Sequence, residues 1–423
     1  MHFMRKVAII GGKRIPFVKS FKEYNRVSNQ EMLTTCLHAL VSSYQLEGNR
    51  IGDVALGALL NRSTEWNFAR ECVLGTALDP HTPAYNVQRA CGTSLDATIQ
   101  LGLRIAAGQI ETGIAGGSDT NSDLPLMLQQ QLSWKLTALK GAKTLGERLR
   151  ILTSIRFREL SPLYPSIVEP RTGLSMGQHT EKMVQEWGIS RQDQDALAYT
   201  SHMNATRAYI AGFFDGLVIP FKNVSRDTII RSDTTPEKLA TLKPAFDRSG
   251  KGTLTAGNST IYTDGAAAVL LACEEYAQRR QWPVQAYFVD GETAAVDYVQ
   301  GEGLLMAPTY AVARMLKRNN LRLQDFDVYE IHEAFCGQVL CTLKAWEDAA
   351  YCKKLGLDAP LGSIDRRKLN TKGGSVAIGH PFAATGARIV AQTAKILQER
   401  GEGRALISIC TAGGMGVTAI LER

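Results

Sequence analysis

The sequence predicts an α/β fold, on three observations. Short apolar stretches of strand length alternate with longer stretches in which apolar residues recur at helical spacing. Glycine pairs follow several of the apolar stretches, as expected where a buried strand ends in a turn. The chain has 423 residues, 44% of them hydrophobic and 21% charged, which suffices for two or three domains. The alternation is typical of a mostly parallel sheet covered by helices.

The first and last thirds of the chain show this alternation most clearly. In the first third we expect strands at 7–11, 54–60, 84–90 and 112–117, and helices at 28–44 and 94–107. In the last third we expect strands at 326–332 and 404–410, helices at 333–346 and 385–398, and a glycine-rich loop at 373–381. A cysteine or histidine, a helix, a strand and a Gly-Gly pair follow one another in both thirds. This shared order suggests that one α/β unit is duplicated.

The middle of the chain has a different composition. Residues 122–250 are rich in polar and basic helical sequence, and glycine-punctuated strand sequence returns only after them. We therefore expect an N-terminal half made of 1–121 and 251–281, an inserted domain at 122–250, and a C-terminal half at 282–423. Long insertions of this kind usually carry recognition.

Composition and termini exclude several classes of protein. The net charge of +7 is modest for this length and does not indicate a nucleic-acid partner. Eight cysteines without a C-x-x-C pair give no zinc ribbon or disulfide framework, so we expect reduced thiols. The first residues lack a secretory or transit pattern, and no run of about 18 apolar residues occurs, so we expect a cytoplasmic protein without a membrane-spanning helix.

Cys91 is the first candidate for chemistry. It stands at the predicted turn between a strand and a helix, where the helix dipole favours a thiolate and therefore a nucleophile. Gly92 would allow a substrate or a backbone segment to approach closely. The alternative is a small buried residue with a packing role only.

Two histidines and a second cysteine have similar settings. His380 lies in the glycine-rich loop before Pro381, which favours a positioned imidazole. His332 directly follows an apolar strand, where active sites of parallel α/β proteins form, and a helix-capping role is the alternative. Cys410 ends the last strand before a glycine turn and could act as an acid or base, or could be a core thiol.

These four residues together suggest covalent acyl transfer through a thiolate. A metal site built from the same residues is possible in principle, but they lack the short ligand spacing of known zinc motifs, so we expect none. His332-Glu333-Ala334-Phe335 is followed by Cys336 and does not begin an H-E-x-x-H motif.

The motifs resemble those of the thiolase family along nearly the whole chain. They include Gly11-Gly12-Lys13-Arg14, Ala90-Cys91-Gly92-Thr93-Ser94, Ser175-Met176-Gly177, Thr255-Ala256-Gly257-Asn258-Ser259, His332-Glu333-Ala334-Phe335, Gly379-His380-Pro381 and Cys410-Thr411-Ala412-Gly413-Gly414. The resemblance implies a duplicated five-layered α/β/α/β/α fold with an inserted loop domain. It further implies cleavage of 3-ketoacyl-CoA by CoA, to acetyl-CoA and a shortened acyl-CoA, without a cofactor because CoA is a substrate.

The resemblance also implies a role for each residue. Cys91 would form the acyl-enzyme, His380 would activate Cys91 and later CoA, and Cys410 would protonate the leaving enolate. One oxyanion hole would combine the His380 side chain with a water held by His332, and the other would use the backbone N–H groups of Cys91 and Ala412. For CoA binding the family pattern points to Met176, Arg231 and Thr260, each of which could instead be a plain surface or packing residue.

Two departures from the usual family pattern concern the subtype. Many thiolases have Asn where this chain has His332, and the histidine resembles the β-subunits of the multienzyme complexes of fatty-acid β-oxidation. Ala412 stands where glycine is commoner, which leaves a backbone donor in place. The likeness implies a homodimer or tetramer and a possible hydratase/dehydrogenase partner subunit.

A basic segment at 132–160 could carry such docking. Its net charge is +5, and its basic residues interleave with leucine, isoleucine, tryptophan and phenylalanine. A basic helix with an apolar face suits an anionic membrane surface or a partner subunit. The alternative is a solvated helix whose apolar face packs on its own domain.

The sequence leaves several functions open. The leading hypothesis is a 3-ketoacyl-CoA thiolase of fatty-acid β-oxidation, and the first alternative is a biosynthetic acetoacetyl-CoA thiolase that condenses two acetyl-CoA molecules. A decarboxylating ketosynthase would share the fold and one cysteine, and a non-catalytic lipid-binding or scaffold subunit would need none of the four reactive residues.

Overall fold

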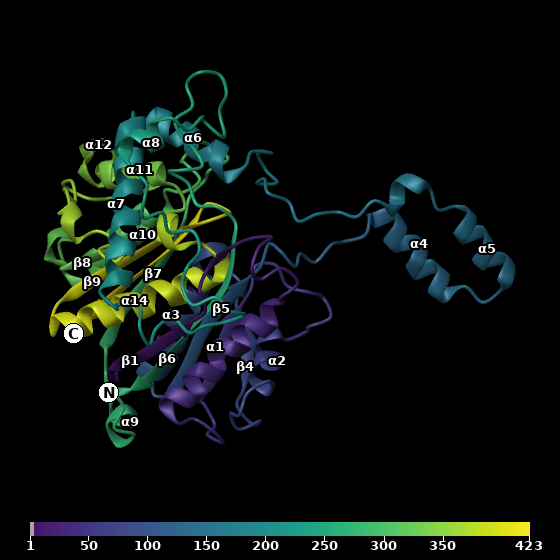
Figure 1. Cartoon of the computed structure of the whole chain (residues 1–423), viewed down its shortest axis with the longest axis horizontal. Helices are drawn as coiled ribbons and strands as arrows, with labels where there is room; N and C mark the ends of the chain where they lie inside the picture. Colours follow the sequence, from purple (N-terminus) through teal and green to yellow (C-terminus); the bar gives the residue numbers. More distant parts are fainter. Residues whose placement is uncertain (1–3) are drawn as a thin grey trace.

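A ten-stranded sheet forms the centre of the molecule in the computed structural model, which describes residues 4–423 (Figure 1). The strands lie in the order β4-β3-β5-β6-β1-β7-β10-β9-β8, and the short β2 pairs with β6 outside this path. Their bounds are β1 (Val7–Arg14), β2 (Val18–Lys19), β3 (Asp53–Gly57), β4 (Ala84–Asn86), β5 (Thr112–Asp119), β6 (Thr263–Cys273), β7 (Ala286–Ala295), β8 (Val328–Ile331), β9 (Arg404–Thr411) and β10 (Met415–Glu422).

The strand order confirms an internal duplication. The series β3-β5-β6-β1 of the first half is repeated in mirror order by β8-β9-β10-β7 of the second half. In each series the first pair is parallel and the following pairs are antiparallel. The halves join at the centre, where β1 and β7 pair antiparallel with Val7 opposite Phe288.

The expectation of a mostly parallel sheet was wrong. Only the pairs β3–β4, β3–β5 and β8–β9 are parallel within residues 4–423. The residues 412–414 between β9 and β10 form a tight turn, and a turn of this length can join only antiparallel neighbours. Alternation of strands and helices therefore identified the class of fold but not the relative direction of its strands.

The helices and strands form five layers, because the strands of both halves face a helical centre and carry further helices on their outer faces. In β1, Val7 and Ile9 face a central core that also contains the helices α3 (Thr93–Ala106) and α14 (Thr385–Arg400) and strands of both halves. Ala8 and Ile10 point the other way, towards α1 (Asn29–Tyr44). On the second half, α10 (Ala307–Asn319) and α11 (Cys336–Glu347) cover the outer face.

The remaining short helices complete the two halves. They are α2 (Phe68–Leu74), α9 (Glu274–Arg279), α12 (Ala349–Lys354), α13 (Ser375–Ile378) and the 3₁₀ turns η1 (Ala90–Gly92), η3 (Leu323–Asp325), η4 (Arg366–Lys368) and η5 (Phe382–Ala384). None of the helices described in residues 4–423 combines the length and apolarity that crossing a bilayer requires.

A long excursion interrupts the first half. β5 and β6 are direct neighbours, with Asp119 opposite Gly265, yet the chain between them runs through residues 120–262. The excursion contains α4 (Gln130–Gly141), α5 (Leu145–Thr153), η2 (Phe157–Leu160), α6 (Met176–Glu186), α7 (Arg191–Ile210) and α8 (Pro236–Ala240). A buried pair of Arg14 Nη1 and Asp227 Oδ1, 2.6 Å apart, ties it to β1. The bounds 122–250 expected for the insertion fall inside this excursion.

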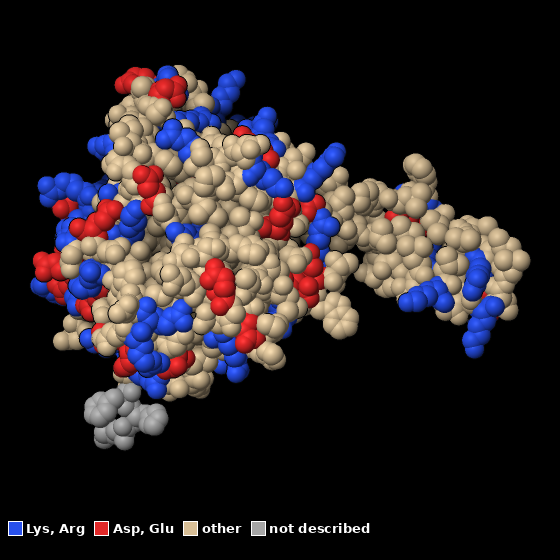
Figure 2. Space-filling view, turned by 60° about the horizontal axis from the view of Figure 1, so that its bottom comes forward, with Lys and Arg blue, Asp and Glu red and all other residues tan. Residues whose placement is uncertain are grey.

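The helices α4 and α5 project away from the body of the molecule on two extended connections (Figure 1). We refer to residues 130–160 as the projecting hairpin. Its apolar side chains are largely exposed, including Trp134 at 64% and Phe157 at 90%, and a groove of about 460 Å³ between the two helices is lined mainly by leucine. Figure 2 shows the hairpin as a mostly uncharged surface with Lys and Arg along one edge. The structure therefore does not pack this apolar face on the hairpin's own domain.

The close approach of α3 and α14 generates the first prediction. A Cβ atom on Gly386 would lie 2.2 Å from the backbone nitrogen of Leu95, so the two helices have no room for a side chain there. We expect Gly386→Ala to lower the free energy of unfolding by about 1–3 kcal/mol, measured as a fall in thermal midpoint. The matched control is Gly146→Ala in α5, where the added Cβ meets nothing within 4 Å among residues 4–423. An equal midpoint for the two variants would contradict the prediction.

Candidate active site

Cys91 lies in a strained turn at the start of α3. The preceding residue, Ala90, has a left-handed φ of +45°, which is costly for a residue with a side chain. A Cβ on Gly92 would lie 2.6 Å from Val417 Cγ2, so the residue after the cysteine must be glycine for the turn to sit against β10. The backbone therefore fixes the direction of the Cys91 side chain.

His380 lies directly beside the Cys91 thiol. Its Nε2 atom is 3.1 Å from Cys91 Sγ, although the two residues are 289 positions apart in the chain. Its Nδ1 atom is 2.6 Å from Thr385 Oγ1, and its backbone N–H donates to Thr263 Oγ1 at 2.8 Å. An imidazole that carries its proton on Nδ1 donates to Thr385 and leaves Nε2 free to accept the thiol proton.

Burial keeps this pair neutral at rest. Burial raises the pKa of the Cys91 thiol to about 12. Burial and then the charge of Arg388 lower the pKa of His380 to about 3. Desolvation of a thiolate opposes the effect of the helix start. The contact with His380 Nε2 would allow the imidazole to take the proton of a neutral Cys91 thiol.

His332 completes the group that faces the thiol. It follows β8 directly, and its ring centroid is 4.1 Å from that of His380. Its Nδ1 atom is 2.7 Å from Ser375 Oγ, which in turn accepts from Arg388 Nη2 at 2.6 Å. Its Nε2 atom is buried and has no hydrogen-bond partner among residues 4–423. This free nitrogen can hold a water molecule or a substrate oxygen.

Cys410 lies near the end of β9, close to the same centre. Its side chain is buried, and burial together with the nearby Cys91 holds the pKa of its thiol well above the usual range. The thiol therefore keeps its proton until a strong base such as an enolate approaches. The structure thus brings all four predicted reactive residues to one end of the central layer.

Buried carboxylates fix the loops that carry the histidines. Glu333 accepts from Ser201 Oγ at 2.8 Å, from Asn370 Nδ2 at 2.6 Å and from the backbone N–H of Val376 at 3.2 Å. Asp119 accepts from the backbone N–H of Ala383 at 2.8 Å, just after His380. Sequence patterns gave no sign of either role.

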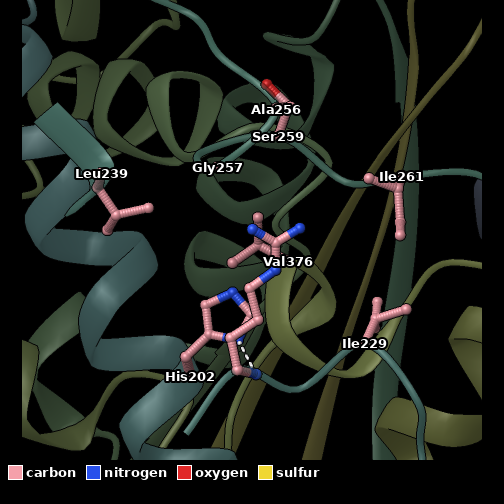
Figure 3. Close-up of a pocket in the computed structure, with 9 residues that line it drawn as sticks. His202, Ile229, Leu239, Ala256, Gly257, Ser259, Ile261 and Val376 are labelled. Carbon is pink, nitrogen blue, oxygen red and sulfur yellow. Dashed lines mark hydrogen bonds between the residues drawn. The ribbon is translucent and has the colours of Figure 1, made fainter. Parts of the chain in front are cut away.

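The three residues expected to bind CoA all lie in the excursion between β5 and β6. Arg231 lines a pocket with His202, Ile229, Leu239 and Val376, and the His202 Nδ1 atom accepts from the Arg231 backbone N–H at 3.2 Å (Figure 3). Thr260 donates twice to the carbonyl of Ala334, next to His332. Met176 packs against the apolar cluster that contains Cys410.

Glu169 makes a contact that the sequence did not reveal. It lies where the chain returns from the projecting hairpin, and its Oε1 accepts from the backbone N–H of Gly413 at 2.9 Å, while Tyr298 donates to its Oε2 at 3.4 Å. The neighbouring residue, Ala412, carries one of the two oxyanion donors that the family pattern implies. Glu169 therefore holds the turn that contains Ala412.

We expect Glu169→Ala to lower kcat roughly tenfold with a smaller change in KM, because a charge-assisted hydrogen bond worth about 1.5–3 kcal/mol is lost beside the reacting atoms. Glu169→Gln keeps an acceptor oxygen and should recover much of the rate. Steady-state kinetics of both variants checks this, and an unchanged kcat for Glu169→Ala would contradict it.

Comparisons with known proteins agree with this geometry. The thiolase N-terminal domain family model matches residues 7–275, and the thiolase C-terminal domain model matches residues 283–423. Proteins named 3-ketoacyl-CoA thiolase from Colwellia psychrerythraea and Shewanella woodyi are 39% and 40% identical to the chain, each over 99% of it and 97% of their own length.

Solved structures show the same fold. The crystal structure of the Bacillus anthracis acetyl-CoA acetyltransferase superposes with a TM-score of 0.83 at 29% identity and covers 100% of both chains. The Acat5 thiolase of Ascaris suum in complex with coenzyme A superposes with a TM-score of 0.81 at 24% identity, which bears on the fold alone. Both halves of the chain are matched, and the chain belongs to the thiolase family.

Proposed function

We propose that the chain is a 3-ketoacyl-CoA thiolase of fatty-acid β-oxidation, which cleaves 3-ketoacyl-CoA with free CoA to acetyl-CoA and a shortened acyl-CoA. The observation that carries this proposal is the buried contact of 3.1 Å between Cys91 Sγ and His380 Nε2, with the Cys410 thiol close by. The named relatives that the chain matches over 99% of its length support the same substrate class.

In the first half of the reaction, His380 Nε2 takes the proton of Cys91 as the sulfur attacks the 3-keto carbon. The bond between C2 and C3 then breaks and leaves the acyl group on Cys91 and the enolate of acetyl-CoA. Cys410 gives its proton to C2 of the enolate, because a thiol with a raised pKa is matched to a strong carbon base. His380 afterwards returns its proton to Cys410.

In the second half, His380 takes the proton of an incoming CoA thiol. The CoA sulfur attacks the acyl carbon, the bond to Cys91 breaks, and His380 gives the proton back to Cys91. Thr385 keeps the imidazole in the required tautomer through its contact with Nδ1 in both halves. Atoms and protons balance without a cofactor.

Two sets of donors stabilise the charge that develops on oxygen. The backbone N–H groups of Cys91 and Ala412 are the proposed donors to the carbonyl oxygen of the acyl group on Cys91. Nε2 of His332 and of His380 can serve the thioester oxygen, directly or through a water held by His332. Donors fixed in a buried site contribute more than the same donors in water.

The pocket beside Arg231 is the proposed entry for CoA (Figure 3). Arg231 offers a guanidinium for a phosphate group, and Val376, which also lines the pocket, directly follows Ser375, the partner of His332. Met176 and Thr260 would line the course of the pantetheine arm towards Cys91.

A biosynthetic acetoacetyl-CoA thiolase is the second candidate. The likeness to the Bacillus anthracis acetyl-CoA acetyltransferase over the full length of both chains favours it. A ketosynthase would not need the buried Cys410 thiol, and a non-catalytic scaffold would not need the Cys91–His380 contact.

Thiolysis of 3-ketoacyl-CoAs of graded chain length separates these candidates. We expect cleavage of medium or long substrates with free CoA, and a covalent acyl adduct on intact protein that Cys91→Ala abolishes. The matched control is Cys36→Ala, a buried cysteine outside the site, which should keep the adduct. Activity on the shortest substrate alone would favour the second candidate, and an adduct on Cys91→Ala would place the nucleophile elsewhere.

We also propose that the protein is a cytoplasmic homodimer or tetramer whose projecting hairpin touches an anionic membrane surface. The exposed Trp134 and Phe157, the leucine-lined groove and the basic edge of the hairpin support this contact. A hydratase/dehydrogenase subunit that hands over the 3-ketoacyl-CoA is the alternative occupant of the hairpin.

We expect the protein to co-sediment with anionic liposomes at low salt. Reversing Arg148, Arg150 and Arg156 to glutamate should abolish co-sedimentation, because each basic residue near an anionic surface contributes about 1 kcal/mol. Reversal of Arg279, Arg322 and Arg367, which are exposed on the body, is the control. Equal sedimentation of the two triple variants would reject the membrane contact.

A further inference from the structure

Three donor atoms of different chemistry converge on one buried point. The ligand atoms of Cys91, His332 and His380 all lie within 4.8 Å of one another. They come from three separate loops, and all three side chains are buried. The unpartnered Nε2 of His332 is the strongest sign that a ligand belongs here, because a buried nitrogen without a partner is costly.

We propose that Cys91, His332 and His380 form a reversible binding site for Zn²⁺, and that an occupied site holds the enzyme inactive. One thiolate and two imidazoles are a ligand set that Zn²⁺ prefers, with a fourth position open to water. Ligand spacing along the chain gave no sign of the site, since spacing reports only ligands that are near in sequence.

Both imidazoles are already oriented for a metal. The Nδ1 atom of His380 contacts Thr385 Oγ1 at 2.6 Å, and the Nδ1 atom of His332 contacts Ser375 Oγ at 2.7 Å. Each contact leaves Nε2 as the free nitrogen. Hydrogen bonds of this kind to the second ring nitrogen are what fixes metal-binding histidines in known sites.

The distances require only a small contraction. Zn–N bonds of about 2.0–2.1 Å and a Zn–S bond of about 2.3 Å in a tetrahedron place the ligand atoms about 3.3–3.6 Å apart. The Cys91–His380 pair is at 3.1 Å and would open slightly, and the widest pair, within 4.8 Å, would close by about 1 Å. The Cys91 thiol releases its proton to the solvent as the Zn–S bond forms.

His332 makes the site a property of this chain rather than of every thiolase. A family member with asparagine at this position would offer one thiol and one imidazole. A bound Zn²⁺ would occupy a lone pair of Cys91 Sγ and one of His380 Nε2, so neither atom could take part in the reaction. The inhibitory part of the inference therefore rests on the proposed function, whereas the binding part rests on geometry alone.

The test uses tag-free, full-length protein that has been dialysed against a chelator and then titrated with Co²⁺ and Zn²⁺. We expect one equivalent of Co²⁺ to give the near-ultraviolet thiolate-to-cobalt band and the visible bands of a tetrahedral site, and Zn²⁺ to displace it. Cys91→Ser should lose the thiolate band. His332→Asn should weaken Zn²⁺ binding about tenfold or more. His38→Asn, an exposed histidine on α1, is the matched control and should bind as the unaltered protein does.

Absence of the thiolate band at one equivalent of Co²⁺ would overturn the proposal. Persistence of the band in Cys91→Ser would also overturn it. So would an unchanged Zn²⁺ affinity in a His332→Asn protein whose circular dichroism spectrum is native. Thiolysis should fall with Zn²⁺ occupancy and return with chelator. Because the band is read without turnover, a protein that binds Co²⁺ but cleaves no 3-ketoacyl-CoA would disprove the proposed function alone, and one that cleaves it without the band would disprove the metal site alone.

Discussion

The contact between the first turns of α3 and α14 is the constraint on which the rest of the structure depends. Ser94 Oγ donates to the carbonyl of Ala383 at 2.5 Å and accepts from the backbone N–H of Ala387 at 2.7 Å, and Gly386 has no side chain to keep the helices apart. Cys91 and His380 precede these two turns. The contact between Cys91 and His380 therefore follows from the packing of α3 against α14.

The same packing sets the chemistry by excluding water. Two thiols and two imidazoles lie together without a net charge, because charging any one of them in a buried place is costly. A substrate that brings a carbonyl oxygen to the proposed N–H donors favours the separation of charge there. The Cys91 thiol therefore stays protonated until a substrate binds, which protects it from oxidation.

The sequence patterns predicted many of the helices and strands and proposed four reactive residues, but they predicted few of the contacts between these residues. Cys91 and His380 could be recognised because glycines beside them showed turns, whereas Glu169 stands in a segment without such signals, and its role depends on meeting Gly413. The direction of β6 and β10 could not be read from apolar stretches, because strands of either direction bury the same side chains. The projecting hairpin was recognisable from its charge and its apolar residues. Its projection away from the body depends on tertiary structure, which the sequence pattern does not report.

The duplication has a consequence for how the enzyme becomes active during synthesis. The two copies are not equivalent partners, since the first carries Cys91 and the second carries His380, at matching places before α3 and α14. A ribosome releases the complete first copy long before His380 emerges. The nascent chain therefore carries an unactivated thiol, and reactivity towards thioesters begins only when the last helix docks on the first copy.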